Sequence, residues 1–263
     1  MSHRRRDTVT VSPPSLDRTG FVRTDAALPG PHAPFDRAWL LARFDEGLQV
    51  RLLKPPREGV VMFQPGRLAW RPVEGAARAV VVHDLRTGAG PQARENTARL
   101  WSAAERFARY YGYPMVLALI GEGPGLVAPE RAPGRGWVTV DRGAGGVRLV
   151  ARILHGPVAL PRLPSDWGLR AAALGPGVVI QTTGESRRLE RLAAARVSAL
   201  QRRGRTARHL RLRDADAARN GAIRPAAAYA VACDGRLLGG PEVSLSRMLG
   251  LSADAVAPAQ SPS

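Results

Sequence analysis

In the first 75 positions, some hydrophobic residues recur with the spacing of a helix and others with the spacing of a strand. In "FDRAWLLARFDEG" the bulky residues recur every three or four positions up to Gly47, which predicts a helix with a glycine stop. "LQVRLL" alternates with a period of two, as in a strand, and ends at Pro55-Pro56. "VVMFQPG" and "LAWRPV" flank Pro65-Gly66, a turn dipeptide, so we expect an antiparallel hairpin there.

The middle of the chain holds the longest regular pattern. "ARAVVVHDLR" is apolar at consecutive positions, as expected of a central strand that is buried on both faces. A long amphipathic helix follows, with Pro91 suited to its first turn and Gly112 to its end. Its apolar stripe consists of Leu100, Ala104, Phe107, Ala108 and Tyr111. "PMVLALIG" is a further buried strand, and "GWVTVDRGAGGVRLVARIL" predicts two strands around a glycine-rich turn.

A second run of alternating strands and helices is predicted after a proline-rich segment. The sequence therefore predicts two α/β domains. We expect a flexible N-terminal segment at 1–34, a first domain at 35–155, a linker at 156–166, a second domain at 167–252 and a disordered tail at 253–263. The second domain has the predicted order strand, helix, strand, short helix, hairpin, helix. Asp214 starts its short helix, and Asp234-Gly235 turns its hairpin.

Composition narrows the classes of protein. The 263 residues carry a formal net charge of +17, yet Lys54 is the only lysine, so the other 38 basic residues are arginines. This skew is typical of a GC-rich coding sequence and does not by itself indicate a nucleic-acid partner. The single cysteine, Cys233, allows no intramolecular disulfide and no cysteine-based metal cluster. Without a secretory signal or an apolar run of membrane-spanning length, we expect a cytoplasmic protein without a metal and without a membrane partner.

The order of elements in the first domain is similar to that of the Gcn5-related N-acetyltransferase (GNAT) superfamily. The resemblance rests on "EGLQVRLL", on "FQPGRLAWRPV" with Ala69-Trp70-Arg71, and on His83 in the next strand. "PVALPRLPSDW" and "CDGRLLGGPEVSLSRMLG" resemble the interdomain segment and the C-terminus of acetyltransferases that carry a YoaP-like domain. The implied fold is α/β: a GNAT-like mixed, mainly antiparallel sheet with flanking helices, followed by a smaller thioredoxin-like domain.

The resemblance implies acetyl-CoA as the substrate and an amine as the acetyl acceptor. In such a fold the pyrophosphate is held by backbone N–H groups at a helix N-terminus, and the pantetheine arm lies beside a strand whose neighbour splays away. The family's phosphate loop has its nearest counterpart in Arg86-Thr87-Gly88-Ala89-Gly90, one residue short and followed by Pro91. The implied binding residues are Leu85, Arg86, Gly88, Ala89, Gly90 and Arg94.

Catalytic residues are harder to place by the same resemblance. Met62, next to Phe63, stands where similar enzymes have an acidic residue, and no tyrosine follows in the region where they have an acid. His83 and Asp84 are the remaining titratable pair. Neighbouring strand residues point to opposite faces, so only one of them can face a cleft. We take His83 as the candidate base, against the alternative of a hydrogen-bonded core histidine.

The second domain resembles a thioredoxin-like fold without its redox chemistry. Thr182 to Ser186 occupy the turn where redox members carry cysteine, and no sulfur is present. Pro225 falls where that fold usually has a cis-proline. Ten arginines against Glu190 alone lie between Arg187 and Arg213, a stripe that could bind an acidic partner or RNA. Three functions remain open: an N-acetyltransferase, a catalytically dead protein or scaffold of the same fold, and a basic binding protein.

Overall fold

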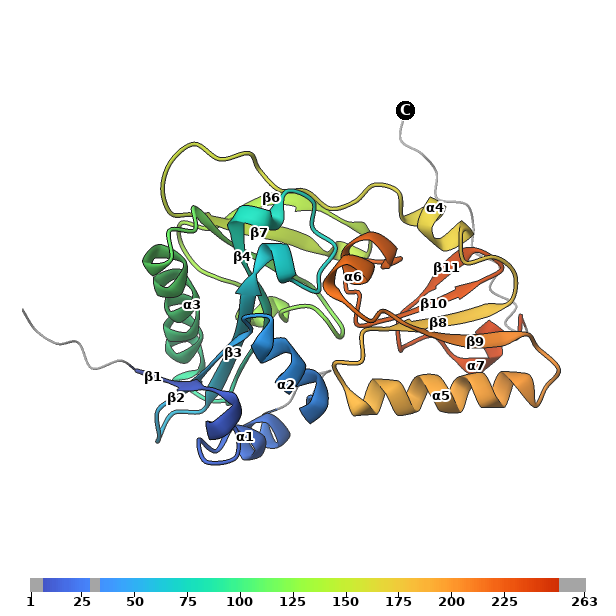
Figure 1. Cartoon of the computed structure of the whole chain (residues 1–263), viewed down its shortest axis with the longest axis horizontal. Coiled ribbons are helices and arrows are strands. Elements are labelled where there is room, and N and C mark those ends of the chain that lie inside the picture. The colour runs from blue at the N-terminus through green and yellow to red at the C-terminus, as the bar shows by residue number, and fades with distance from the viewer. Residues whose placement is uncertain (1–6, 29–33, 251–263) are drawn as a thin grey trace, which may run out of the picture.

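A seven-stranded sheet forms the centre of the first half of the chain (Figure 1). The computed structural model describes residues 7–28 and 34–250. The strands lie in the order β1-β2-β3-β4-β5-β7-β6, and all neighbours are antiparallel except β4 and β5, which are parallel. Their bounds are β1 Thr8–Val11, β2 Gln49–Leu53, β3 Gly59–Pro65, β4 Ala79–Thr87, β5 Met115–Ile120, β6 Val138–Arg142 and β7 Arg148–Ile153. This mixed, mainly antiparallel sheet confirms the predicted fold class.

The N-terminal segment is not the flexible tail that the sequence predicted, as far as it is described. β1 pairs with β2 at the edge of the sheet, from Thr8 opposite Leu53 to Val11 opposite Val50. A short helix, α1 Phe21–Ala27, then buries Phe21 in the core. The prediction failed because the many prolines and arginines of this segment obscured a four-residue strand. Residues 1–6 and the tail 253–263 lie outside the described residues.

Three helices flank the sheet, and the sequence predicted two of them, α2 and α3. Asp36 caps α2, Arg37–Asp45, by accepting a hydrogen bond from the amide of Trp39 at 2.9 Å. The long helix α3, Ala93–Tyr110, follows Pro91 and ends before Gly112, whose φ of +72° is left-handed. α3 packs on one face of the sheet, whereas α1 and α2 contribute to the core on the other face.

The predicted hairpin at Pro65-Gly66 is wrong. β3 ends at Pro65 and passes into a 3-10 turn, Gly66–Leu68, and the residues up to Gly75 form no strand. A second 3-10 turn, Ala76–Arg78, packs against the first so closely that a Cβ on Gly66 would lie 1.9 Å from the carbonyl oxygen of Ala76. β3 pairs with β4 instead, because the two turns fold this segment back on itself.

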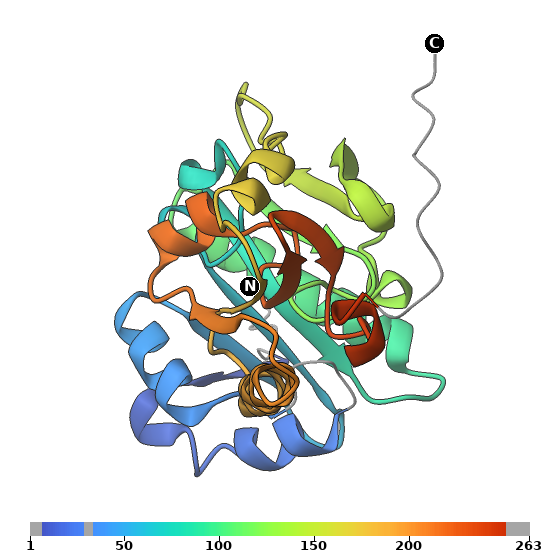
Figure 2. The ribbon, with the colours of Figure 1, turned by 90° about the vertical axis from the view of Figure 1, so that its right-hand side faces the viewer.

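A second sheet of four strands follows the proline-rich segment. Its order is β11-β10-β8-β9, in which β8 and β9 are parallel and the other neighbours are antiparallel. The strands are β8 Val178–Thr182, β9 Ala207–Arg211, β10 Tyr229–Cys233 and β11 Arg236–Gly239. The helices are α4 Trp167–Ala172, α5 Arg187–Gln201, α6 Ala215–Gly221 and α7 Leu245–Met248, and Figure 2 shows α5 end-on.

This order confirms a second, smaller sheet with flanking helices, but one feature counts against the thioredoxin-like assignment. Pro225 precedes β10 as expected, yet the Arg224–Pro225 bond is trans; within the described ranges only Pro55–Pro56 is cis. The expected cis-proline is therefore wrong. Both residues of the predicted hairpin turn, Asp234 and Gly235, have positive φ, as an Asp-Gly hairpin requires.

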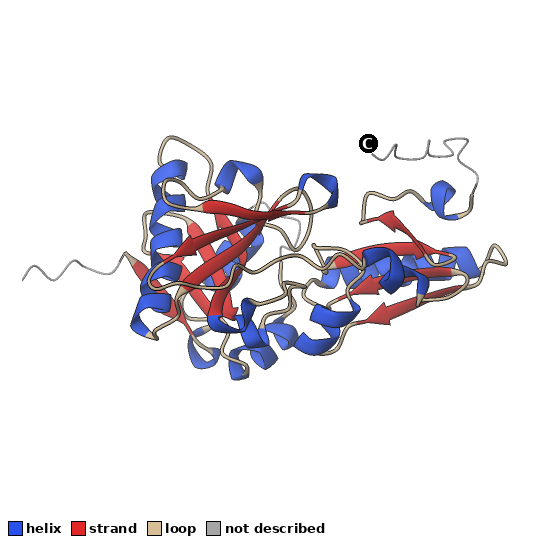
Figure 3. Ribbon diagram, turned by 90° about the horizontal axis from the view of Figure 1, so that it is seen from above, coloured by secondary structure: helices blue, strands red, loops and turns tan. Residues whose placement is uncertain are grey.

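The two sheets lie side by side (Figure 3), and residues of α6 and its flanking loops pack in the same hydrophobic cluster as the first sheet. The face of the large sheet opposite α3 carries side chains from the second domain: Leu212, Ala215, Ala218, Ala222 and Ala227 in one cluster, and Ala226 in another. A Cβ on Gly125 would lie 1.8 Å from the carbonyl oxygen of Ala226. The second domain is therefore packed directly on the first and is more than a tethered module.

Candidate functional site

β4 and β5 separate from each other halfway along their length. They pair only from Ala79 with Met115 to Val82 with Ala118. Beyond that point β4 stays paired with β3 as far as Thr87, and β5 stays paired with β7 as far as Ile120. Each strand therefore follows its outer neighbour, and the middle of the sheet opens toward the end of β4 that leads into α3.

The parting begins at a β-bulge on β4. Met62 lies opposite Asp84, and Phe63 lies opposite Val82, so His83 is an extra residue on β4. A bulge bends its strand and increases the local twist, which turns the end of β4 away from β5. Because the bulge interrupts the alternation of side chains, the rule that His83 and Asp84 face opposite sides does not apply here.

The turn between β4 and α3 presents amides without protein acceptors. Gly88 donates to the carbonyl of Glu58 at 3.2 Å, and Ala93 donates to the carbonyl of Gly90 at 3.0 Å. Within the described ranges no acceptor faces the backbone N–H groups of the remaining donors of the turn and first helical turn: Ala89, Gly90, Gln92, Arg94 and Glu95. No side chain caps the N-terminus of this 18-residue helix. Glu95 lies in its first turn, but the Glu95 carboxylate is paired with Arg99 at 2.5 Å, so the positive end of the helix dipole is only partly offset.

A cavity of about 300 Å³ opens at this turn. Asn96 lines it and is only 6% exposed, and its Oδ1 atom has no hydrogen-bond partner among the described residues. Buried polar atoms are normally paired, so an orphaned oxygen here indicates a place for a ligand or water. Glu58 also lines the cavity, and its Oε2 would lie 3.2 Å from a Cβ on Gly88. The turn itself is open, because Ala89, Gly90 and Pro91 are exposed.

The side chains of Asp84 and Arg86 do not line this cavity. Arg86 Nε donates to Asp84 Oδ2 at 2.7 Å, and its Nη2 donates to Asp25 Oδ1 at 2.5 Å. Nη1 donates to the carbonyls of Asp25 and Leu28 at 3.1 and 3.3 Å. All three ionic side chains are buried. The Arg86 guanidinium therefore already binds protein acceptors and does not face a ligand. We therefore withdraw the Arg86 side chain from the phosphate-binding set and Asp84 from the catalytic candidates.

This buried cluster has two carboxylates for one guanidinium. Burial raises the pKa of the Asp25 carboxyl above its usual range and outweighs the opposing effect of Arg86. Burial lowers the pKa of Arg86, but Asp84 and Asp25 together more than offset this, so the net shift is upward. The Asp25 carboxyl also accepts a hydrogen bond from the amide of Phe35 at 2.8 Å. The cluster therefore fixes α1, Leu28 and Phe35 to β4.

His83 is 1% exposed and lies where the two domains meet. Its carbonyl oxygen accepts a hydrogen bond from Arg71 Nη2 at 3.4 Å. Arg71 Nη1 in turn donates to Glu185 Oε2 at 3.2 Å, across the domain boundary. The backbone of the bulge is thus held by a guanidinium whose partner carboxylate comes from the second domain.

Met62 and Phe63 of β3, where the resemblance suggested an acidic residue, are apolar core positions. Met62 is 0% exposed and packs in the cluster on the side of the second domain. Phe63 packs on the other face, against Phe107 of α3, with 5.1 Å between ring centroids. Leu85 is also buried in that cluster, beneath α3. Neither residue of β3 brings a proton-transfer group to the parting of the strands.

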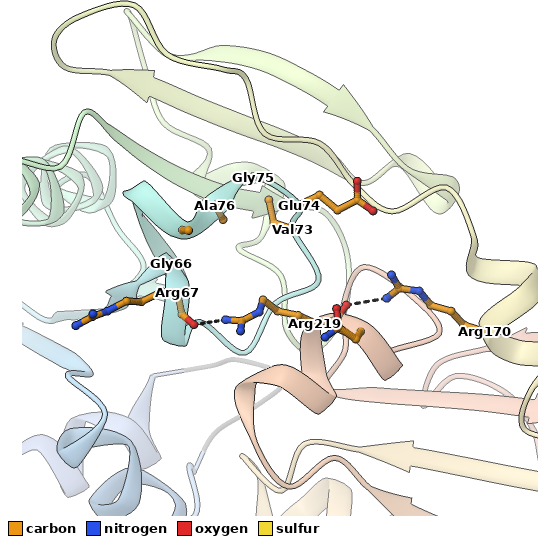
Figure 4. A pocket seen from close by; sticks show the side chains of 10 residues that line it. Gly66, Arg67, Val73, Glu74, Gly75, Ala76, Arg170 and Arg219 are labelled. Atoms are coloured by element: carbon orange, nitrogen blue, oxygen red, sulfur yellow. Dashed lines mark hydrogen bonds between the residues drawn. The ribbon is translucent and has the colours of Figure 1, made fainter.

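A second cavity, of about 400 Å³, lies at the domain boundary (Figure 4). One of its arginines joins the domains, because Arg219 donates to the carbonyl of Arg67; within the second domain Arg170 donates to the carbonyl of Arg219 at 2.7 Å. Glu74 is paired with Arg162, with 2.6 Å between Nε and Oε2. This cavity is therefore a structural joint between the two domains.

The turn between β8 and α5, where the resemblance placed the redox position, is buried against the first domain. Thr183, Glu185 and Ser186 are at most 1% exposed, and Ser186 caps α5 by accepting from the amide of Leu189 at 3.5 Å. Cys233 lies far from this turn in the chain, on β10, and burial raises the pKa of its thiol. The turn therefore serves as part of the domain interface.

The arginine stripe from Arg187 to Arg213 is partly tied to the protein. Arg187 pairs with Asp36 at 2.7 Å, and Arg196 donates to Tyr229 Oη and to the carbonyl of Pro241. In the part of the chain that the structure describes, Arg188 and Arg191 have no partner. No group of three or more His, Cys, Asp or Glu residues among residues 7–28 and 34–250 could hold a metal ion. None of the described helices is both long and apolar enough to cross a membrane.

Comparisons with known proteins give one structural likeness. No family model and no curated protein matches the chain. The solved structure of a ribosomal-protein-alanine N-acetyltransferase from Brucella melitensis is similar to it, with a TM-score of 0.36 and 16% sequence identity. The similarity covers 56% of this chain and 99% of that chain.

Of the predicted site residues, Gly88, Ala89, Gly90 and Arg94 come together at the start of α3 with their backbone facing the cavity or solvent. His83 lies at the parting of the strands, and Asp84 and Arg86 lie in a separate buried cluster. Sequence reasoning missed Asp25, Glu185 and Asn96. For Asp25 a signal existed, since Phe21 and Leu28 flank it at helical spacing in a segment we had taken as flexible. For Glu185 there was none, because its partner is 114 residues away.

Proposed function

We propose that the chain binds acetyl-CoA at the start of α3 and transfers its acetyl group to an amine. The observation that carries this proposal is the coincidence of two features: β4 and β5 part, and α3 begins beside the opening with unpartnered amides. A diphosphate fits such a place, because backbone N–H groups and the helix dipole both favour negative charge there. The YoaP-like assignment of residues 167–252 remains a proposal that the strand order supports.

The residues present fit the diphosphate of a coenzyme A molecule. The amides of Ala89, Gly90 and Gln92 would hold its oxygens, and exposed Arg94 would add charge at the rim. Asn96 Oδ1 could accept a hydrogen bond from the ligand or from a water that bridges to it. The edge of β4 beyond Val82, which β5 does not cover, is the place for an extended arm. Acetyl-CoA would supply an activated acetyl group as a thioester.

Proton transfer is the demanding part of such a reaction, because an amine attacks only after it loses its proton. His83 is the candidate base, since it is the titratable residue at the bulge where the strands part. Asp84 is excluded because its carboxylate is paired with Arg86. Arg71 fixes the His83 carbonyl and so acts as a positioning residue.

A second candidate function is coenzyme binding without turnover. The observation that favours it is the replacement of the expected acid on β3 by Met62 in a fully buried position. A protein of this kind would keep the diphosphate site and use the second domain as a scaffold surface.

Calorimetric titration with acetyl-CoA and with CoA tests the shared part of both candidates. We expect saturable binding by the wild-type chain and at least tenfold weaker binding by Gly90→Asp, which places a carboxylate in an exposed part of the turn. Gly204→Asp is the matched control, since Gly204 has a similarly exposed left-handed backbone at the far end of α5. Absence of binding by the wild-type chain would overturn both candidates.

Release of free thiol in a panel of amines then separates the two candidates. Turnover by the wild type that falls in His83→Ala, with unchanged acetyl-CoA affinity, supports the transferase with His83 as its base. Turnover that survives in His83→Ala removes the base assignment, and binding without any thiol release supports the second candidate.

A further inference from the structure

A groove runs between the C-terminal half of α3 and the edge strands β1 and β2. Its volume is about 560 Å³. It exists because α3 packs over β3, β4 and β5, while a single helix is only about 10 Å wide and leaves the neighbouring strands uncovered. Thr8 and Thr10 of β1 and Arg51 of β2 form one wall, and side chains of α3 form the other.

A row of aromatic rings leads from the core to the rim of this groove. Phe63 contacts Phe107 at 5.1 Å between centroids, Phe107 contacts Tyr111 at 4.6 Å, and Tyr111 contacts Tyr110 at 4.9 Å. The inner rings are buried or half-buried, but Tyr110 is 82% exposed and Tyr111 is 61% exposed. Large aromatic side chains are seldom this exposed when their only role is to pack in the core.

The charge of the groove is positive. Arg51 and Arg106 line it, and no Asp or Glu is among its lining residues. The Arg106 guanidinium is exposed and has no protein partner in the described part of the chain. The nearby Asp7 and Glu95 are both paired with Arg99, at 2.6 and 2.5 Å. These two carboxylates share one guanidinium and keep a net charge of −1, but neither residue is among those that line the groove.

We propose that this groove binds a short stretch of single-stranded nucleic acid. Every base offers a π face that stacks on an exposed tyrosine, whatever the sequence. Guanidinium groups beside the rings match the spaced negative charges of the backbone. The hydroxyls of Thr8, Thr10, Tyr110 and Tyr111 have no partner within residues 7–28 and 34–250, so they are available to sugar and phosphate oxygens. Arginine beside exposed aromatic rings, with no acid in the lining, favours this ligand over an acidic peptide.

The groove is separate from the coenzyme site. α3 has 18 residues and is about 27 Å long. The amides that would hold a diphosphate are at its first turn, and Arg106, Tyr110 and Tyr111 are at its last turns. A nucleotide bound at one end therefore leaves the other end free. The groove is also distinct from the arginine stripe at 187–213, which lies on the second domain.

Fluorescence anisotropy of labelled eight-nucleotide oligo-U and oligo-A at 50 and 200 mM salt tests the proposal with the full chain. We expect binding by the wild type and at least a fivefold loss of affinity in the double variant Tyr110→Ser/Tyr111→Ser, because stacking is lost. Arg106→Gln should weaken binding and lower the slope of log affinity against log salt by about 0.7. Both changes are at exposed side chains, and circular dichroism checks that the fold is unchanged.

Controls separate the groove from general attraction to a chain of charge +17. Arg188→Gln removes the same charge from an exposed, unpartnered arginine of α5, and it should leave oligonucleotide affinity within twofold of wild type. Equal losses in Arg106→Gln and Arg188→Gln, or a loss in Arg188→Gln alone, would overturn the proposal in favour of unspecific or stripe binding.

Competition identifies the ligand class. Excess CoA should not displace the oligonucleotide, since the two sites are at opposite ends of α3. Displacement by CoA would show that the oligonucleotide occupies the coenzyme site, and equal affinity for AMP and the octamer would reduce the groove to a mononucleotide site. Either result, or an affinity of the double tyrosine variant equal to that of the wild type, would overturn the proposal, whereas acetyl transfer is tested separately by the release of thiol.

Discussion

Arg71 and Glu185 form an ion pair between the two domains, with 3.2 Å between Nη1 and Oε2, and each side chain is 1% exposed. They come from segments 114 residues apart. The pair lies directly behind the bulge of β4, because the same guanidinium donates to the carbonyl of His83. The second domain therefore takes part in holding the strand that parts from β5. This makes the interface a determinant of the proposed site.

Removing one partner of this pair should be costly. Glu185→Gln leaves the Arg71 charge buried without a counter-charge, and loss of one partner of a buried pair typically costs about 3–5 kcal/mol. We expect a lower free energy of unfolding of about that size, measured by urea denaturation. The double variant Arg71→Met/Glu185→Leu removes both charges, so it should be more stable than either single variant. A double variant as unstable as the sum of the singles would show that the two residues act independently.

The packing of the domains can be probed through two glycines in one loop. Gly125 and Gly123 both have left-handed φ, +90° and +104°, so alanine strains the backbone at either position. Only Gly125→Ala also drives a Cβ to 1.8 Å from the carbonyl of Ala226 in the second domain, whereas a Cβ at Gly123 meets nothing within 4 Å.

We expect Gly125→Ala to lower the melting temperature clearly more than Gly123→Ala, in a thermal unfolding experiment on the whole chain. It should also increase proteolysis in the segment at 156–166, because the second domain no longer seats fully. Equal effects of the two substitutions would mean that the contact with Ala226 is not maintained in solution.

Much of the first sheet could be predicted from sequence because its signals are local. Pro91 and Gly112 bracket α3, and Gly47 follows the end of α2, as the residue types indicated. The hairpin at Asp234-Gly235 and the short helix after Asp214 also followed from single residues with strong conformational preferences. Such residues determine the backbone within a few positions of themselves, and their effect depends little on tertiary contacts.

The rest depends on contacts between distant segments, and no pattern within a short window reports them. The bulge at His83 was not predicted, because an extra residue in a buried apolar run leaves the hydrophobic pattern unchanged. Arg86 looked like a phosphate ligand until the structure paired it with Asp25, 61 positions earlier. The predicted hairpin at Pro65-Gly66 failed because β4 is a better partner for β3 than the residues that follow the turn. Local chemistry therefore located the turn at the start of α3 but not the residues that support it.

The Asp25–Arg86–Asp84 cluster predicts a particular dependence of stability on pH. The pKa of Asp25 in the folded chain is raised above 3.8, so the native state retains a proton that the unfolded state has lost. The stabilising contribution of this group is complete below pH 3.8 and is lost as pH rises through the folded pKa. Asp25→Asn cannot titrate there and lacks this effect.

The free energy of unfolding of the wild type, minus that of Asp25→Asn, should therefore fall as pH rises from about 3.8 toward neutrality. Guanidinium denaturation at several pH values measures this difference, and the titration of all other groups cancels between the two proteins. A difference that grows with pH would mean that Arg86 dominates and lowers the pKa of Asp25 instead.

Glu58 offers a test in which a substitution should strengthen ligand binding. Its carboxylate lines the cavity at the start of α3 beside Gly88, where it opposes a bound diphosphate. A unit charge several ångströms away near the surface is worth on the order of 1 kcal/mol. Glu58→Gln removes that charge and keeps the backbone carbonyl that accepts from Gly88, so acetyl-CoA should bind about three- to tenfold more tightly in calorimetry at low salt. The gain should shrink as salt screens the charge.

Glu242→Gln makes the same change on the second domain and should leave the affinity unaltered. Unchanged or weaker binding in Glu58→Gln, in a chain that does bind acetyl-CoA, would place the diphosphate away from the α3 turn.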